Sequence, residues 1–210
     1  MKKMIQILAL SAMSLCTCAY ADNQFYIGLG AGYAGAEDMP QGDTFANVDG
    51  VTSQGDSSET ASNYGGRIAV GYLWDTQTDF AYGLETAAAY YGVTKYSNDA
   101  ASVEMNYYGL ELLGVGELSF DKLRLIGKAG ISDEQFHPTK KNIENNPNFT
   151  SSQQVLPEVG AGLAYSFTQD LQVGITYYHT FGTQVSFNSD GDATKLPSVD
   201  LVLLEMAYFL

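Results

Sequence analysis

The chain has 210 residues, 45% hydrophobic and 16% charged, with a formal net charge of −14 at pH 7. This acidic balance argues against nucleic acid as a partner, because a phosphate backbone attracts basic surfaces. The length is enough for one domain.

Residues 1–21 have the organisation of a secretory signal peptide. Two lysines precede an apolar run that is too short to cross a bilayer as a helix, and an A-x-A cleavage site ends at Ala21. We expect cleavage before Asp22, which leaves residues 22–210 as the mature domain. A lipoprotein signal centred on Cys18 is the alternative. If cleavage occurs before Asp22, the mature chain has no cysteine and therefore no disulfide, thiolate or cysteine-bound metal.

The mature chain contains repeated stretches in which apolar residues alternate with small or polar ones. This period of two predicts β-strands with one apolar face. No later apolar run is long enough for a transmembrane helix, so a membrane-crossing form must be a closed barrel that pairs every backbone group. Eight antiparallel strands are predicted, over residues 25–33, 67–74, 80–90, 107–118, 123–131, 158–167, 171–178 and 199–210.

The connections between these strands alternate in length. Three are short, at residues 75–79, 121–122 and 168–170, and four are long, at residues 36–62, 94–102, 133–154 and 182–197. Eight antiparallel strands with both termini in the periplasm have this pattern, with short periplasmic turns and four long extracellular loops. A soluble β-sandwich is the alternative, but its outward apolar rows would then face water.

The last strand has one wholly apolar row, whereas the other row includes Glu205. Such a strand suits a wall between lipid and a polar lumen. The chain ends in Tyr208-Phe209-Leu210, which resembles the C-terminal signature of bacterial outer-membrane β-barrels. This resemblance implies that these residues are a signal for the barrel assembly machinery.

The whole mature chain resembles the small OmpA/OmpX-like outer-membrane β-barrels of Gram-negative bacteria, a group that includes opacity-type surface proteins. The resemblance rests on the signal, the glycine-rich first strand, the Tyr82-Gly83-Leu84-Glu85 segment and the terminal Ala207-Tyr208-Phe209-Leu210. It implies an outer-membrane monomer in contact with lipid and lipopolysaccharide.

Inward rows carry eight ionisable residues, which a narrow barrel would largely desolvate. Hairpin register brings three pairs within reach of each other. The predicted lumen ion pairs are Arg67–Glu85, Glu111–Lys128 and Glu117–Arg124, and Glu158 and Glu205 are further lumen acids without an obvious partner. Similar pairs in OmpA-type barrels plug the interior and have been considered a gate, so by resemblance these could do likewise; a static polar core is the plainer interpretation.

Two functions compete. One is a structural or adhesive surface protein whose loops meet lipopolysaccharide or host surface molecules, and the other is a narrow gated pore for ions or small solutes. The dense carboxylates of the first long loop, residues 36–62, could take a hard divalent cation, but they lack the spacing of an EF-hand, so we predict no specific metal site. We also predict no cofactor.

An outer-membrane enzyme is the third class. Small barrel lipid A deacylases use a His-x-Ser pair on an outward strand face, but His179 is followed by Thr180-Phe181 and His137 by Pro138-Thr139. We therefore predict no catalytic residues.

Overall fold

In the computed structural model, the described residues are 24–36, 58–75, 78–97, 102–142, 152–182 and 196–210. The predicted signal peptide and most of the predicted loops lie outside them. The strands are β1 (Gln24–Ala36), β2 (Ser58–Ser62), β3 (Tyr64–Asp75), β4 (Phe80–Ser97), β5 (Ser102–Phe120), β6 (Leu123–Asn142), β7 (Ser152–Ser166), β8 (Leu171–Thr180) and β9 (Val199–Phe209). No helix among these residues is long and apolar enough to cross a membrane.

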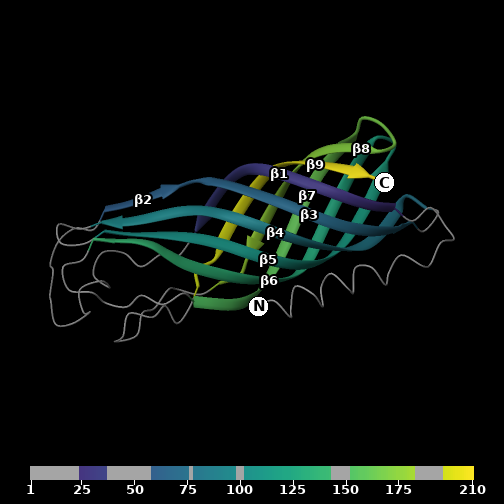
Figure 1. Cartoon of the computed structure of the whole chain (residues 1–210). Coiled ribbons are helices and arrows are strands. Elements are labelled where there is room, and N and C mark those ends of the chain that lie inside the picture. The colour runs from purple at the N-terminus through teal and green to yellow at the C-terminus, as the bar shows by residue number, and fades with distance from the viewer. Residues whose placement is uncertain (1–23, 37–57, 76–77, 98–101, 143–151, 183–195) are drawn as a thin grey trace.

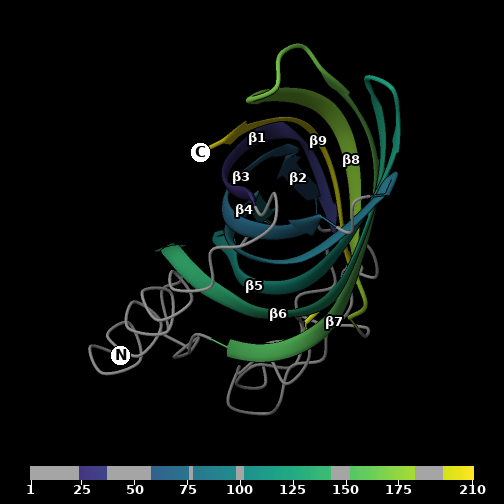
Figure 2. The same cartoon turned by 90° about the vertical axis from the view of Figure 1, so that its right-hand side faces the viewer.

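The strands form a closed antiparallel barrel. Neighbours in sequence are paired from β3 to β9, and β1 joins β9 to β3 and so closes the sheet (Figures 1 and 2). The short strand β2 pairs with the far end of β4 and continues β3 beyond Asn63. The barrel is therefore eight-stranded, as the sequence predicts, with its second strand in two pieces.

Three connections are short and lie at one end of the barrel, here called the turn end, together with Leu210. They join β3 to β4, β5 to β6 and β7 to β8, as predicted. The turn between β5 and β6 consists of Asp121 and Lys122, and Asp121 has a φ of 58°, a conformation that aspartate tolerates better than most residues. The opposite end is the loop end.

Several strands extend further toward the loop end than predicted. β4 and β5 include most of the predicted loop 94–102, β6 and β7 cover much of the predicted loop 133–154, and β2 lies in the predicted loop 36–62. The prediction used the apolar outward row, which ends sooner than the backbone pairing does. On β6, for example, Ile131 is followed on the outward face by Asp133 and Gln135.

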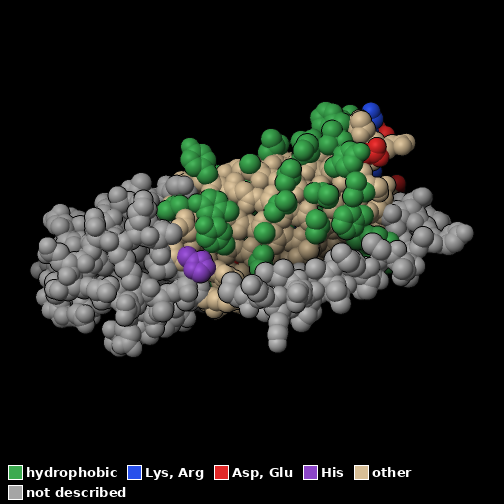
Figure 3. Space-filling view, in the orientation of Figure 1, with side chains coloured by type: hydrophobic (Ala, Val, Ile, Leu, Met, Phe, Trp, Pro, Cys, Tyr) green, Lys and Arg blue, Asp and Glu red, His purple; other side chains and the backbone are tan. Residues whose placement is uncertain are grey.

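The outer surface carries the predicted apolar rows. Half-exposed leucine, isoleucine, valine and aromatic side chains cover the middle of the barrel, and the face shown in Figure 3 has hydrophobic side chains and backbone there. Aromatic pairs lie toward both ends of the outer surface, such as Trp74 with Tyr82 at the turn end, 5.5 Å between ring centroids, and Tyr90 with Tyr108 toward the loop end, at 5.3 Å. This arrangement suits an apolar band between two aromatic girdles.

Candidate functional site in the barrel lumen

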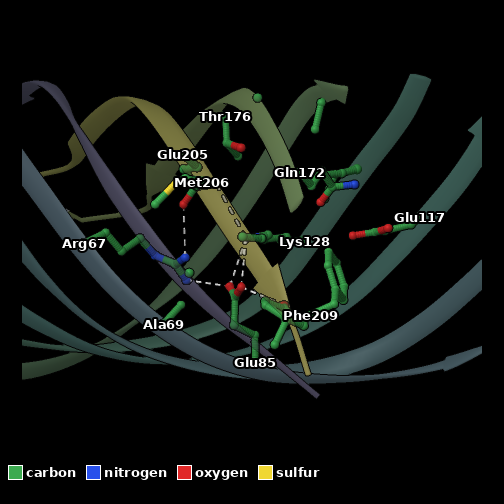
Figure 4. Close-up of a pocket in the computed structure, with 16 residues that line it drawn as sticks. Arg67, Ala69, Glu85, Glu117, Lys128, Gln172, Thr176, Glu205, Met206 and Phe209 are labelled. Atoms are coloured by element: carbon green, nitrogen blue, oxygen red, sulfur yellow. Dashed lines mark hydrogen bonds and ion pairs between the residues drawn. The ribbon is translucent and has the colours of Figure 1, made fainter. Parts of the chain in front are cut away.

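Five charged side chains meet in the middle of the lumen. The guanidinium of Arg67 lies 2.6 Å from Glu85, 2.7 Å from Glu111 and 3.3 Å from Glu205. The ammonium of Lys128 lies 3.0 Å from Glu85 and 3.8 Å from Glu205. These residues come from β3, β4, β5, β6 and β9, so the network crosses the lumen. Figure 4 shows four of them, Arg67, Glu85, Lys128 and Glu205.

Each of the three glutamates also accepts a hydrogen bond from a tyrosine. The pairs are Tyr26 with Glu85 at 2.7 Å, Tyr91 with Glu111 at 3.1 Å and Tyr178 with Glu205 at 2.8 Å. Lys128 donates to the hydroxyl of Tyr178, and the guanidinium of Arg67 stacks over its ring at 4.6 Å. A buried charge is stable only when it is paired and hydrogen-bonded, and this network meets both conditions.

Glycines on the lumen face make room for two of these tyrosines. A Cβ at Gly71 would lie 2.3 Å from the ring of Tyr26, and a Cβ at Gly109 would lie 2.5 Å from the hydroxyl of Tyr91. Either contact is far shorter than van der Waals packing allows. The glycines of the lumen row are therefore part of the site.

A cavity of about 40 Å³ lies on the turn side of the network. Glu117, Gln172 and Thr176 line it together with Lys128 and Glu205 (Figure 4). A space of this size has room for about one to three water molecules, and its polar walls could hydrogen-bond them.

Apolar side chains close the lumen on both sides of the network. At the turn end the cluster contains Tyr26, Leu73, Val115, Ile126, Ala164 and Phe209. Toward the loop end a second cluster contains Ala34, Ala89, Tyr91, Tyr107, Leu113, Leu156, Tyr178, Leu196, Val199, Leu201 and Leu203. Leu113 and Leu203 have no exposed surface at all. The described part of the lumen is therefore filled rather than open.

The structure places the predicted ion-pair residues on the lumen side but pairs most of them differently. Arg67 and Glu85 are together as predicted, although they lie four positions out of direct register. Glu111 and Lys128 are not partners, because each reaches across the lumen to another strand. Contacts in this narrow barrel run across the interior, whereas the prediction considered only neighbouring strands.

The third predicted pair is also replaced. Arg124 donates to the hydroxyls of Ser119 and Ser166, and Gln172 bonds to Glu117, so the described residues show no close ion pair between Arg124 and Glu117. Glu205, predicted to lack a partner, is bound by both cations of the network and by Tyr178.

Two carboxylates lie nearer the loop end. Glu158 was predicted to lack a partner, and its Oε2 has none. Glu134 was not predicted, because it falls in the stretch interpreted as a loop, yet it is a buried lumen residue of β6. Continued alternation with Ser132 and Lys128 was the signal that could have identified it.

On the outer surface His179 and Asp200 form a polar pair, with Nδ1 of His179 2.8 Å from Oδ1 of Asp200. Tyr177 donates to the same oxygen. Thr180, the next residue, points into the lumen and is 1% exposed, so it lies on the wrong face to act with His179.

Comparison with known proteins identifies the family of the chain. Residues 7–196 match the family described as outer membrane protein beta-barrel domain. An uncharacterized protein of Coxiella burnetii (strain RSA 493 / Nine Mile phase I) is 23% identical over 217 residues, which cover 88% of this chain and 84% of that protein.

Two solved structures share the fold. The outer membrane protein OprG from Pseudomonas aeruginosa is 11% identical, with a TM-score of 0.52, and the match covers 90% of this chain and 96% of OprG. A major outer membrane protein from Thermus thermophilus is 13% identical, with a TM-score of 0.53, over 90% of this chain and 100% of that protein.

Proposed function

Because the chain belongs to the outer membrane protein beta-barrel domain family, we propose that it is a monomeric surface protein. In this proposal the barrel is a membrane anchor, and the loop end is the surface that meets lipopolysaccharide or host surface molecules. The signal of residues 1–21 exports the chain, and Tyr208, Phe209 and Leu210 are read by the barrel assembly machinery.

The observation that carries the proposal is the continuous network across the lumen. Arg67 and Lys128 are held by three glutamates and by Tyr178, and their side chains are at most 6% exposed. Opening a path through this network would separate buried opposite charges, at a cost of several kcal/mol. A filled interior favours an anchor over the alternative of a narrow gated pore for ions or small solutes.

The strand lengths support a role at the loop end. A tilted strand needs about 9 to 11 residues to cross a bilayer, whereas β4, β5 and β6 have 18, 19 and 20 residues. Together with β2, which pairs with β4 as far as Ser97, their backbones extend past the remaining strands toward the loop end (Figure 1). A rigid sheet that rises above the membrane would hold a contact surface away from the lipid.

Adhesion of whole cells tests the proposal. The full chain is expressed in a non-adherent Gram-negative host, and attachment to cultured mammalian cells is compared with that of a variant in which a short Gly-Ser linker replaces residues 37–57. The matched control replaces the turn residues Asp121 and Lys122 with Asn-Gly at the opposite end. Heat-modifiable gel mobility verifies that each barrel is folded.

We expect the wild type and the turn variant to raise attachment above that of the empty host, and the loop variant to lose this increase. Attachment equal to the empty host for a folded wild type would contradict the adhesive role.

A further inference from the structure

Glu134 and Glu158 are two unusual acids at the loop end of the lumen, on the neighbouring strands β6 and β7 and four positions out of direct register. Each residue is 1% exposed, and three of their four carboxylate oxygens have no hydrogen-bond partner: both oxygens of Glu134 and Oε2 of Glu158. The Thr180 hydroxyl faces Glu134 as a hydrogen-bond donor, but its geometry satisfies neither carboxylate oxygen. Neither glutamate is in an ion pair with a described residue.

The charged groups that face this pair do not neutralise it. Glu111 on β5 and Glu85 on β4 add negative charge, and Tyr91 on β4 bonds to Glu111. Arg67 on β3 is the cation that acts most strongly on Glu158, and Glu85, Glu111 and Glu205 already occupy its guanidinium. Two ionised carboxylates here would be desolvated and unpaired, which costs several kcal/mol each.

A proton is the ligand that fits this site best. A hard metal ion takes six to eight oxygen ligands, whereas the third nearby carboxylate, Glu111, already has its oxygens bound by Arg67 and Tyr91. A proton on each glutamate removes the charge and supplies the missing hydrogen-bond donor.

The cross-strand neighbours of the two acids lie close to a buried segment, residues 196–198, which directly precedes β9. Glu134 is directly opposite Gln154, whose side-chain oxygen accepts a hydrogen bond from the backbone N–H of Leu196 at 3.2 Å. Glu158 is directly opposite Thr180, which in turn is opposite Val199.

The segment itself, residues 196–198, is buried. The backbone N–H of Gly182 donates to the hydroxyl of Ser198 at 3.1 Å, and Leu196 is 1% exposed within the loop-end apolar cluster. Gln154, opposite Glu134, makes one of the contacts that hold the segment, and Gly182, two residues after Thr180, makes the other.

We propose that Glu134 and Glu158 form a proton-binding site, and that the neutral form of this site keeps residues 196–198 seated in the loop end of the barrel. Loss of the protons places two negative charges beside Glu111. Repulsion between the carboxylates and their need for hydration then move Gln154 and Thr180 apart, and residues 196–198 move out of their buried position. The site is independent of what the loops bind.

Thiol labelling measures the seating. The cysteines of the chain, Cys16 and Cys18, lie in the predicted signal, so Leu196→Cys gives a single reporter in the exported barrel. The folded protein is purified from outer membranes and labelled between about pH 6 and pH 9, a range in which a buried carboxyl can titrate. At each pH, the labelling rate of the Leu196→Cys protein is divided by the rate of a triple variant that carries Leu196→Cys, Glu134→Gln and Glu158→Gln. The intrinsic pH dependence of the thiol then cancels.

We expect this ratio to rise by about tenfold per pH unit if one proton leaves on opening, and by up to about a hundredfold if two leave. Glu117→Gln is the matched control, since it neutralises a lumen acid on the turn side and should leave the rise unchanged. A ratio that stays constant, or a rise that Glu117→Gln abolishes, would overturn the proposal.

Hydrogen exchange provides the same test without a reporter or a glutamine variant. The amide of Leu196 donates one of the two bonds that hold the segment, and the amide of Gly182, which also donates to the backbone oxygen of Thr180, donates the other. Their protection factors should fall with rising pH while that of an amide in the paired middle of β5, such as Leu113, stays high. Equal pH dependence at all three amides would contradict the proposal.

Discussion

Replacing Arg67 tests how strongly the lumen network holds the barrel together. The side chain is 1% exposed and bonds to three glutamates. Arg67→Met keeps much of the aliphatic volume but removes the charge. Glu85 would retain Lys128, whereas Glu111 would retain only Tyr91. Removing one partner of a buried pair costs about 3 to 5 kcal/mol, and we expect the free energy of unfolding to fall by that amount.

Urea unfolding of the purified barrel in detergent micelles measures this change. The emission of Trp74, the only tryptophan, reports on the outer surface, and heat-modifiable mobility gives an independent probe of the fold. Arg124→Met is the control, because Arg124 is partly buried and donates to two serine hydroxyls rather than to buried carboxylates, so its removal should cost less. If Arg67→Met costs no more than Arg124→Met, the reasoning about the network is refuted.

A second substitution identifies the cause of the loss. Glu111→Gln removes the charge that Arg67→Met leaves unpaired, so the double variant should be more stable than the sum of the two single changes predicts. A coupling energy of about 1 to 3 kcal/mol is expected for residues in contact. Simple additivity would indicate that packing, rather than charge, explains the loss.

Two further substitutions test the glycine and tyrosine positions by the same urea assay. Gly71→Ala would place a Cβ 2.3 Å from the ring of Tyr26 and should lower the free energy of unfolding by about 1 to 3 kcal/mol. The control is Gly127→Ala, whose Cβ would face outward with nothing within 4 Å and should change stability little; equal losses of stability in the two variants would count against the packing argument. Tyr178→Phe removes a hydrogen bond to Glu205 and should cost about 1.5 to 3 kcal/mol, as for bonds to charged groups, and an unchanged midpoint would mean that water replaces the hydroxyl.

The architecture could be predicted from the sequence because the wall of a barrel requires apolar residues at every second position of each strand. Outward rows such as Leu110, Leu112 and Leu118 must meet lipid, and they are about half exposed in the structure. Short turns identify one end of the barrel, which fixes the hairpins and the direction of each strand. The ends of β4, β5 and β6 could not be predicted, because strands above the membrane need no apolar row.

The lumen partners could be predicted only in part. Alternation assigns Arg67, Glu85, Glu111 and Lys128 to the inner face, and this assignment is correct. Which of them meet depends on strand stagger and on how far each side chain reaches across the closed interior. The links between Arg67 and Glu111 and between Lys128 and Glu85 join non-adjacent strands, so no hairpin register contains them.

Single-channel conductance in a planar bilayer tests the central claim, that the barrel is a filled anchor, most directly. The purified wild-type barrel should pass no discrete current at neutral pH, because the network and the two apolar clusters occupy the lumen. Arg67→Ala and Lys128→Ala, checked for folding by heat-modifiable mobility, should also be silent, since both clusters remain. Discrete openings in the wild type that grow when either cation is removed would contradict the account and support a gated pore.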